Sequence, residues 1–281
     1  MAAFELVAPS SVDGVIAALR TEEPGAVGVL AGGTDLLLDL DDGRAAPRRV
    51  VSLRRLPWKT LDWADGSLSI GSTLPLRAVE NDPEVRRRIP GLWQAVRAVG
   101  SVALRHRATL GGNLGRSAPS SDLIPVLLAL DAEVDLVGPD GPRRMSVDRF
   151  VRASRRTELG PHELIRSVRI PEAPVSAYRW QRVRPANDIS QLAIAVALRP
   201  ADGGWRVAIG GIPPRPSLLP DVAAALGRGA PGATEIERAA ERATREVAIV
   251  ADRRASEEYR RSLVGTLLRR AVASAAPGGH P

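Results

Sequence analysis

The chain has 281 residues and no cysteine, and the missing cysteine limits its fold more than any other feature. Disulfides, a thiolate nucleophile, cysteine-based zinc sites and cysteine-bound iron–sulfur clusters are all excluded. The three histidines, His106, His162 and His280, stand far apart and form no HxH, HxxH or HExxH pair. Hydrophobic cores must therefore hold the chain together, and we expect no metal site. The length is sufficient for two domains.

The chain is basic, but its charge distribution does not favour nucleic acid as a partner. Its 39 Lys and Arg residues against 32 Asp and Glu residues give a formal charge of +7. The arginines are spread among the acids, with no dense basic tract and few aromatic residues to stack on bases. No apolar run approaches the roughly 20 residues of a membrane span. The first residues do not resemble an export signal, and we expect a cytoplasmic protein.

Short apolar segments and helical spacings alternate in the first half of the chain. Ser10 or Ser11 is expected to cap a first helix whose apolar residues share one face. The segment that opens at Ser101 is expected to be a loop. Further elements are predicted from the pattern: strands over 26–31 and 50–53, a hairpin over 61–70 that turns at Asp65-Gly66, a helix over 85–99 interrupted near Pro90, a helix over 122–130 and a strand over 132–137.

A boundary is expected near residues 171–174, where prolines separate two kinds of pattern. Beyond it, three antiparallel strands are predicted over 178–183, 189–198 and 205–210, followed by an irregular connection over 211–220 and helices over 235–250 and 256–275. The tail, 276–281, is expected to be disordered. This order of elements predicts an α+β protein with a larger N-terminal part and a smaller C-terminal part.

The first of two glycine-rich segments follows a predicted buried strand and reads Leu30, Ala31, Gly32, Gly33, Thr34, Asp35 and Leu36. Adjacent glycines permit positive φ and leave no Cβ in the way of a ligand. Successive N–H groups can form a concave anion site, to which the Thr34 hydroxyl adds a donor. This chemistry suits a pyrophosphate, although a tight turn alone would also explain the segment. Neither a GxGxxG nor a P-loop motif is present.

The second segment also offers a hydroxyl, paired glycines and an amide, in Thr109, Gly111, Gly112 and Asn113. Eight residues beyond Asn113, Ser121 is placed to cap the predicted helix over 122–130. Its neighbour Asp122 has the chemistry to bind a ribose hydroxyl or an adenine amino group. Two such segments, both without bulky side chains, suggest a long diphosphate cofactor that lies between them.

Several stretches resemble one family over nearly the whole chain. RHRATLGGNL followed by SAPSSDLIPVLLALDAEV resembles the second FAD motif of the medium subunits of molybdenum hydroxylases, such as carbon monoxide dehydrogenase and xanthine dehydrogenase. LAGGTDLLLDL resembles their first FAD motif, and RRTELGPHELIRSVRIP resembles the end of their FAD-binding domain, which is of the PCMH type. AIGGIPPRPSLLP and ASEEYRRSLVGTLLRRAV are similar to their C-terminal domain. The motifs occur in the family's order.

This resemblance implies a fold and a set of cofactor contacts. The FAD-binding domain would span 1–171, in two α+β subdomains over about 1–56 and 57–171. A smaller C-terminal domain over 172–275 would contain a three-stranded antiparallel sheet and helices. The first glycine segment would wrap the FAD pyrophosphate, and the second would contact the phosphates and ribitol. Asp122 would hold the adenosine end, and Ile165 would lie against the flavin ring.

One position departs from the family pattern. Many relatives carry a lysine near the flavin ring at the position that aligns with Trp180. A cation there would stabilise the anionic reduced flavin, so its absence would change the redox poise unless Arg179 or Arg182 substitutes. Trp180 is equally explained as a strand residue packed in the core. Asp188 matches an acid of the family in the same stretch, and a structural role would also explain it.

The resemblance leaves three functions to compare. In the first, this flavin-dependent oxidoreductase is a subunit of a dehydrogenase complex. It would pass electrons from a [2Fe–2S] subunit, itself supplied by a molybdopterin subunit, to NAD⁺, a quinone or O₂. In the second, the chain is a stand-alone FAD-dependent oxidoreductase that acts directly on a small molecule. In the third, it is a cofactor-free scaffold, which two intact glycine segments disfavour. No residue is assigned a catalytic role.

Overall fold

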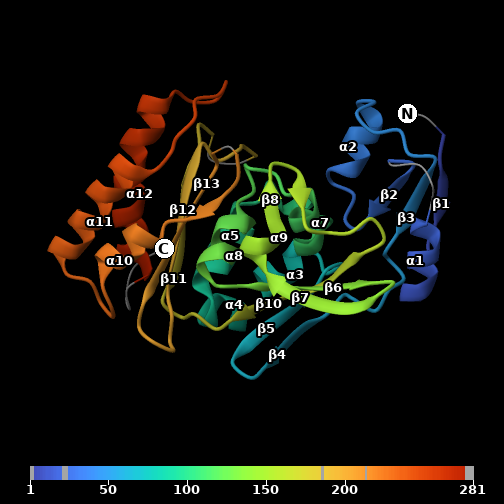
Figure 1. The fold of residues 1–281 in the computed structure, drawn as a ribbon, viewed down its shortest axis with the longest axis horizontal. Helices are drawn as coiled ribbons and strands as arrows, with labels where there is room; N and C mark the ends of the chain where they lie inside the picture. Colours follow the sequence, from blue (N-terminus) through green and yellow to red (C-terminus); the bar gives the residue numbers. More distant parts are fainter. Residues whose placement is uncertain (1–2, 21–24, 185–186, 213, 276–281) are drawn as a thin grey trace.

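The computed structural model describes residues 3–20, 25–184, 187–212 and 214–275. It contains three larger sheets and a two-stranded one, with helices between and outside them, so the α+β prediction is confirmed. Figure 1 shows the N-terminal sheet at one end of the molecule and the C-terminal helices at the other. The tail that we expected to be disordered, 276–281, lies outside the described residues.

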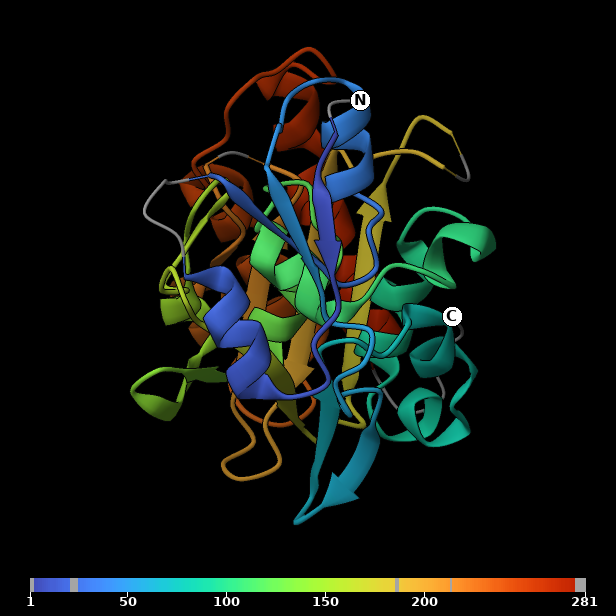
Figure 2. The same cartoon turned by 90° about the vertical axis from the view of Figure 1, so that its right-hand side faces the viewer.

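The first sheet is parallel and small. Its order is β1-β3-β2, and its elements are β1 (Glu5–Val7), α1 (Val12–Leu19), β2 (Val27–Leu30), α2 (Leu36–Asp41) and β3 (Arg49–Ser52). The predicted cap of α1 is confirmed, because the Ser11 hydroxyl accepts a hydrogen bond of 3.1 Å from the Gly14 N–H. Figure 2 shows this sheet with α1 and α2 in front of the rest of the chain.

The second sheet is antiparallel, with the order β4-β5-β10-β6-β7. Its strands are β4 (Leu61–Ala64), β5 (Ser67–Gly71), β6 (Glu133–Gly138), β7 (Gly141–Ser146) and β10 (Leu164–Pro171). The turn of the predicted hairpin is confirmed at Asp65 and Gly66, which have φ of 49° and 67°. The central strand of this sheet, β10, is thus the last of the five in the sequence, and it pairs with β5 on one side and β6 on the other.

Helices cover one face of the second sheet and form the largest core with it. The helices of this domain are α3 (Leu76–Asn81), α4 (Pro83–Arg88), α5 (Pro90–Ala98), α6 (Val102–Arg105), α7 (Leu110–Arg116), α8 (Leu123–Ala129) and α9 (Val147–Phe150). A small hairpin of β8 (Val151–Ala153) and β9 (Arg156–Thr157) follows α9. The predicted interruption near Pro90 is confirmed, since α4 ends and α5 begins on either side of Ile89.

The third sheet is antiparallel, with the order β11-β12-β13-β14. Its strands are β11 (Ser176–Gln181), β12 (Leu192–Leu198), β13 (Trp205–Gly210) and β14 (Ser217–Leu218), and its helices are α10 (Pro220–Leu226), α11 (Ala233–Glu246) and α12 (Glu257–Ala275). Three strands were predicted, and β14 adds a fourth of two residues within the connection that was expected to be irregular.

The central strand β12 is buried on both faces, and its side chains alternate in size. Ala193, Ala195 and Ala197 belong to the core shared with the N-terminal helices, whereas Leu192, Ile194 and Val196 belong to the core shared with α10 to α12. Small side chains on the first face permit a close approach by α5 and α8. The two parts of the chain are therefore packed together rather than joined only by a linker.

The expectation of a loop after Ser101 is wrong, because this stretch contains α6 and α7. Ser101 and Thr109 are their N-caps and accept hydrogen bonds from the N–H groups of Leu104 and Gly112. Glycine disfavours helix by about 1 kcal/mol per residue relative to alanine, and this penalty pointed to a loop. The caps and the tertiary packing of the glycines outweigh it.

Candidate functional site

A cavity of about 650 Å³ lies between β2 and α2 on one side and α6, α7 and β10 on the other. Both glycine segments line it, as do residues 187–189 from the connection between β11 and β12. All but two of the residues predicted to hold a cofactor belong to its wall, and the exceptions are Leu30 and Trp180. The fold thus brings together segments that are far apart in the sequence.

The first glycine segment is shaped by its contact with the chain ahead of α7. Gly33 has φ of 82°, in the left-handed region that favours glycine. A Cβ at Gly32 would lie only 2.0 Å from the carbonyl oxygen of Arg107. A side chain is therefore excluded at Gly32 by backbone packing, and this packing holds the segment against the start of the second one.

The second glycine segment forms the first turn of α7. A Cβ at Gly111 would lie 2.4 Å from the Cβ of Ser72, so α7 packs directly on the residue that follows β5. A Cβ at Gly112 would lie 3.9 Å from the Cβ of Ala31, so the two segments are in van der Waals reach of each other. Residues of both segments line the same cavity.

Asn113 and Ser121 connect α7 to the start of α8. The Ser121 hydroxyl donates a hydrogen bond of 2.5 Å to Asn113 Oδ1 and accepts hydrogen bonds from the N–H groups of Leu123 and Ile124. The predicted capping role of Ser121 is confirmed by these two contacts. Because Asn113 Oδ1 accepts from Ser121, the Asn113 amide offers a further contact through the donors of its NH₂ group.

An ion pair connects α2 to α7 at the cavity wall. Asp39 accepts hydrogen bonds from Arg116 at 2.5 Å and from Arg44 at 2.8 Å, and Arg116 also lies 3.6 Å from Asp35. The hydrogen bond from Arg116 holds the pKa of Asp39 below its ordinary value, against the desolvation that acts to raise it. The carboxylate therefore stays ionised and keeps both helices at the wall.

Asp122 is placed at the cavity wall, but its carboxylate is engaged with the C-terminal domain. Oδ1 accepts hydrogen bonds from the hydroxyls of Tyr178 at 2.7 Å and Ser190 at 2.6 Å, and Oδ2 accepts one from Arg182 at 2.7 Å. Side chains of both partners of the Arg182 ion pair are at least nine-tenths buried. The expected contact with the adenosine end of a cofactor stays a prediction, and the observed role of Asp122 is to connect α8 with β11 and the segment before β12.

Burial is the largest influence on the pKa values of Asp122 and Tyr178 in the cluster that they form with Ser190 and Arg182. Desolvation raises the pKa of Asp122 above its ordinary value, although Arg182 and the two hydroxyls act to lower it. Desolvation also raises the pKa of Tyr178 well above its ordinary value, so the phenol stays a hydrogen-bond donor. Removal of any one member would leave buried polar groups without partners.

Ile165 and Trp180, the two predicted contacts of a ring system, lie in different surroundings. Ile165 on β10 lines the cavity, and its Cδ1 would lie 3.7 Å from a Cβ at Gly115. Trp180 on β11 stacks on Tyr178 with ring centroids 5.4 Å apart, and it packs on the large core. Neither Arg179 nor Arg182 lines the cavity. The arrangement agrees with Trp180 as a packed strand residue.

Several residues of the cavity wall were not predicted from the sequence. Ser72, Asp39 and Arg116 belong to it, and so does Asp188, which had been matched only to an acid of the family. Asp188 closes its own turn, since its carboxylate accepts hydrogen bonds from the N–H groups of Val183, Arg184 and Ile189. An acid within the apolar run LLLDLD was the one sequence signal for Asp39.

Other kinds of site have no support within the described residues. In that part of the chain, no group of three or more His, Asp or Glu side chains could hold a metal ion. Among the described helices, none combines the length and apolar character of a membrane span.

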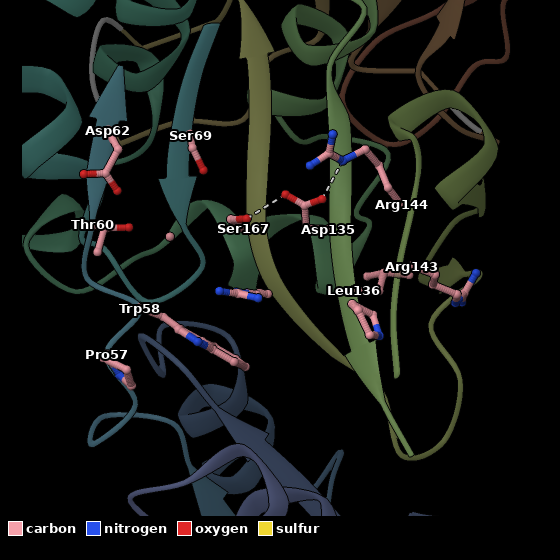
Figure 3. Close-up of a pocket in the computed structure, with 13 residues that line it drawn as sticks. Pro57, Trp58, Thr60, Asp62, Ser69, Asp135, Leu136, Arg143, Arg144 and Ser167 are labelled. Carbon is pink, nitrogen blue, oxygen red and sulfur yellow. Dashed lines mark hydrogen bonds and ion pairs between the residues drawn. The ribbon is translucent and has the colours of Figure 1, made fainter. Parts of the chain in front are cut away.

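A second hollow of about 680 Å³ lies on the outer face of the second sheet, opposite the helices. Figure 3 shows its polar lining: Asp135 lies between Ser167 and Arg144, and Asp62 and Ser69 lie on neighbouring strands. Asp135 accepts hydrogen bonds from Ser167 at 2.9 Å and from Arg144 at 2.6 Å. Arg143 pairs with Glu163, which lies outside this hollow, and the predicted site residues do not line it.

The cavity between the glycine segments is thus the one that suits a cofactor. Its volume is within the range of about 300–1,000 Å³ that ligand sites occupy. Exposed main chain, the Thr34 and Thr109 hydroxyls, and the apolar Ile165 supply donors at one part of the wall and an apolar surface at another. This combination defines a protein that binds an extended cofactor with a phosphate-bearing part and an apolar ring.

Comparison with known families identifies that cofactor. Residues 2–173 match the model of the FAD binding domain in molybdopterin dehydrogenase, and residues 176–275 match that of the CO dehydrogenase flavoprotein C-terminal domain. The chain belongs to this family, the FAD-binding medium subunits of the molybdenum hydroxylases. The resemblance inferred from the sequence motifs is confirmed.

Curated relatives and solved structures agree with this assignment over nearly the whole chain. The chain is 28% identical to the nicotine 6-hydroxylase medium subunit of Paenarthrobacter nicotinovorans over 277 residues, and this alignment covers 97% of each chain. It is 29% identical over 262 residues to a putative xanthine dehydrogenase FAD-binding subunit of Escherichia coli, covering 89% of this chain and 90% of the relative. The structure of quinoline 2-oxidoreductase from Pseudomonas putida superimposes with a TM-score of 0.90 at 25% identity, over 99% of this chain and 98% of that one.

Proposed function

We propose that the cavity between the glycine segments holds FAD and that the bound flavin passes electrons from a [2Fe–2S] partner subunit to a terminal acceptor. FAD supplies chemistry that accepts and releases electrons singly or in pairs. The observation that carries the proposal is the convergence of both glycine segments and Ile165 on one cavity. We also propose the domain limits expected above, 1–171 and 172–275.

Different residues of the cavity wall would contact different parts of the cofactor. Main-chain N–H groups near Gly32, Gly33 and Gly111 would bind phosphate oxygens, since all three residues line the cavity. The hydroxyls of Thr34 and Thr109 add donors, although the Thr109 oxygen already accepts from the Gly112 N–H. Ile165 provides an apolar surface for the ring and keeps water away from it. The Asp39–Arg116 pair keeps α2 and α7 together at the wall.

The role of this chain as one part of a larger complex rests on two observations. The relatives that it matches over nearly their whole length carry names of medium subunits or chains of dehydrogenases and hydroxylases. The chain has no cysteine, so the thiolates that bind a [2Fe–2S] cluster would come from another subunit. We propose a [2Fe–2S] subunit and a molybdopterin subunit as partners, and NAD⁺, a quinone or O₂ as the acceptor. The cytoplasmic location stays a prediction.

The proposal is tested by purification of the chain alone and together with the proposed iron–sulfur and molybdenum subunits. We expect a flavin spectrum from the chain alone and stoichiometric FAD. In the complex, reduction of the iron–sulfur cluster should be followed by bleaching of the flavin in stopped-flow absorbance. A chain that binds no added FAD would refute cofactor binding. A flavin that a small-molecule substrate reduces in the isolated chain would instead support the stand-alone oxidoreductase.

A further inference from the structure

Ser72 carries a buried hydroxyl for which the protein provides no partner. It follows β5 directly and is 2% exposed, and its Oγ makes no hydrogen bond within the described chain. A serine hydroxyl can rotate to donate and to accept, and a buried polar group without a partner costs free energy. The unpaired state of such an adaptable group calls for an explanation.

The position of Ser72 is fixed by its neighbours. Its N–H donates a hydrogen bond of 3.0 Å to the Arg166 carbonyl, which continues the β5–β10 pairing by one residue. On its other side, α7 packs on it so closely that a Cβ at Gly111 would lie 2.4 Å from the Ser72 Cβ. Ser72 is therefore fixed between the β5–β10 pairing on one side and α7 on the other.

Ser72 differs from the other unpaired groups in where it lies. Among the described buried side chains with unpaired polar atoms, which are Trp63, Ser72, Thr73, His162, Gln191 and Arg260, Ser72 alone lines the cavity between the glycine segments. Its neighbour Thr73 is 6% exposed and also has an unpaired hydroxyl, but it does not line the cavity. The chain thus provides a matched pair of adjacent hydroxyls, one at the cavity and one away from it.

We propose that Ser72 is a further cofactor-binding residue whose hydroxyl donates a hydrogen bond to an oxygen of the bound FAD. This inference rests on the proposed function, because it assumes that the cavity holds that cofactor. Ser72 adds a donor from the end of β5, a third part of the chain beside the two glycine segments. The acceptor is an oxygen of the phosphates or of the flavin and its ribityl chain, and separate probes distinguish these two parts.

The test compares Ser72→Ala with Thr73→Val in the full chain after removal of flavin. For wild type and both variants, the dissociation constant of FAD is measured by quenching of flavin fluorescence, and the thermal midpoint is measured without FAD. We expect Ser72→Ala to weaken FAD binding about 3- to 10-fold and Thr73→Val to leave it unchanged. Without FAD, Ser72→Ala should unfold at the wild-type temperature or above it, because the substitution removes an unpaired buried hydroxyl.

The same variants are then titrated with ADP and with FMN. A loss confined to ADP assigns the Ser72 contact to the phosphates next to adenosine, and a loss confined to FMN assigns it to the flavin part. Wild-type affinity of Ser72→Ala for FAD would overturn the inference and leave the proposed function intact. An equal loss in Thr73→Val would also overturn it, because the effect would then come from the fold. Failure of wild type to bind FAD would refute the proposed function itself.

Discussion

Two hollows of nearly equal volume, about 650 and about 680 Å³, lie on the two sides of the second sheet. The cavity on the helix side is lined by glycine main chain and by an unpaired hydroxyl at Ser72. The hollow on the outer side is lined by the side chains of acids and arginines, among which Arg144 pairs with Asp135 and Arg143 pairs with Glu163 outside the hollow.

The difference teaches that volume does not identify a binding site. Arg143 and Arg144 of the outer hollow gain little from a ligand, because a new contact would replace an existing ion pair. A surface of exposed main-chain donors and an unpaired hydroxyl gains a partner for each group that the ligand reaches. The convergence of both glycine segments and the unpaired Ser72 hydroxyl, and not the size of the space, points to the cavity between the glycine segments.

The largest expected effect is on the free energy of unfolding, and it separates the buried ion pair at the cavity from the exposed ion pair in the outer hollow. Asp122→Ala leaves Arg182 buried without its counter-charge and should lower the free energy of unfolding by about 3–5 kcal/mol. Asp135→Ala removes the partner of Arg144, whose side chain is 45% exposed, and should cost at most about 1 kcal/mol. Urea unfolding of both variants measures the difference. Similar losses from the two substitutions would contradict the contrast between a buried and an exposed pair.

The next effect concerns glycines of the cavity wall. Gly32→Ala would place a Cβ 2.0 Å from the Arg107 carbonyl oxygen, and it should lower stability by about 1–3 kcal/mol and reduce flavin retention. Gly115→Ala places its Cβ in ordinary contact, 3.7 Å from Ile165, and should raise the stability of the flavin-free chain by up to about 1 kcal/mol, because alanine favours helix. Thermal unfolding and the flavin content after gel filtration check both. Equal stability of the two variants would show that the close approach at Gly32 is not limiting.

A smaller effect depends on pH and tests the pair between α2 and α7. Since the folded chain lowers the pKa of Asp39 below its ordinary value of 3.8, ionisation of Asp39 stabilises the fold fully above that value. This contribution is lost as pH falls below 3.8 toward the lower folded pKa. Urea unfolding of wild type and Asp39→Asn from about pH 7 to about pH 3 should show a stability difference that is constant at first and then shrinks. A difference that grows on acidification would contradict the sign.

The smallest effect is expected in the outer hollow. Arg166 lies at a bulge of β10, and its exposed side chain points to the hollow and not to the cavity wall. Arg166→Ala should therefore leave the FAD dissociation constant unchanged and alter stability by no more than about 0.5 kcal/mol. Fluorescence titration and urea unfolding check this. Weaker FAD binding in this variant would indicate that the outer hollow contributes to the site.

The sequence predicted the parts of the fold and site that depend on local chemistry. The turn at Asp65 and Gly66, the cap at Ser11 and the two glycine segments carry their signal in adjacent residues. A glycine in the sequence indicates a close backbone contact of this kind, because a side chain at a position such as Gly32 would clash with the neighbouring main chain.

The remainder depends on partners that are distant in the chain. The carboxylate of Asp122 is engaged by Tyr178, Ser190 and Arg182, at separations of 56 to 68 residues that no local pattern reveals. Helix α7 was missed because its glycines disfavour a helix locally, and the packing that requires glycine at Gly111 involves Ser72, 39 residues earlier. The unpaired hydroxyl of Ser72 is likewise visible only when all its neighbours are in place.

Hydrogen–deuterium exchange of the full chain with and without FAD tests the central claim most directly, because it reports on both hollows at once. We expect FAD to protect peptides that cover residues 31–36 and 109–113, because both segments line the cavity. Peptides that cover 133–146, at the outer hollow, should exchange at the same rate in both states. Protection confined to the outer strands, or none at the glycine segments of a flavin-loaded chain, would contradict the account.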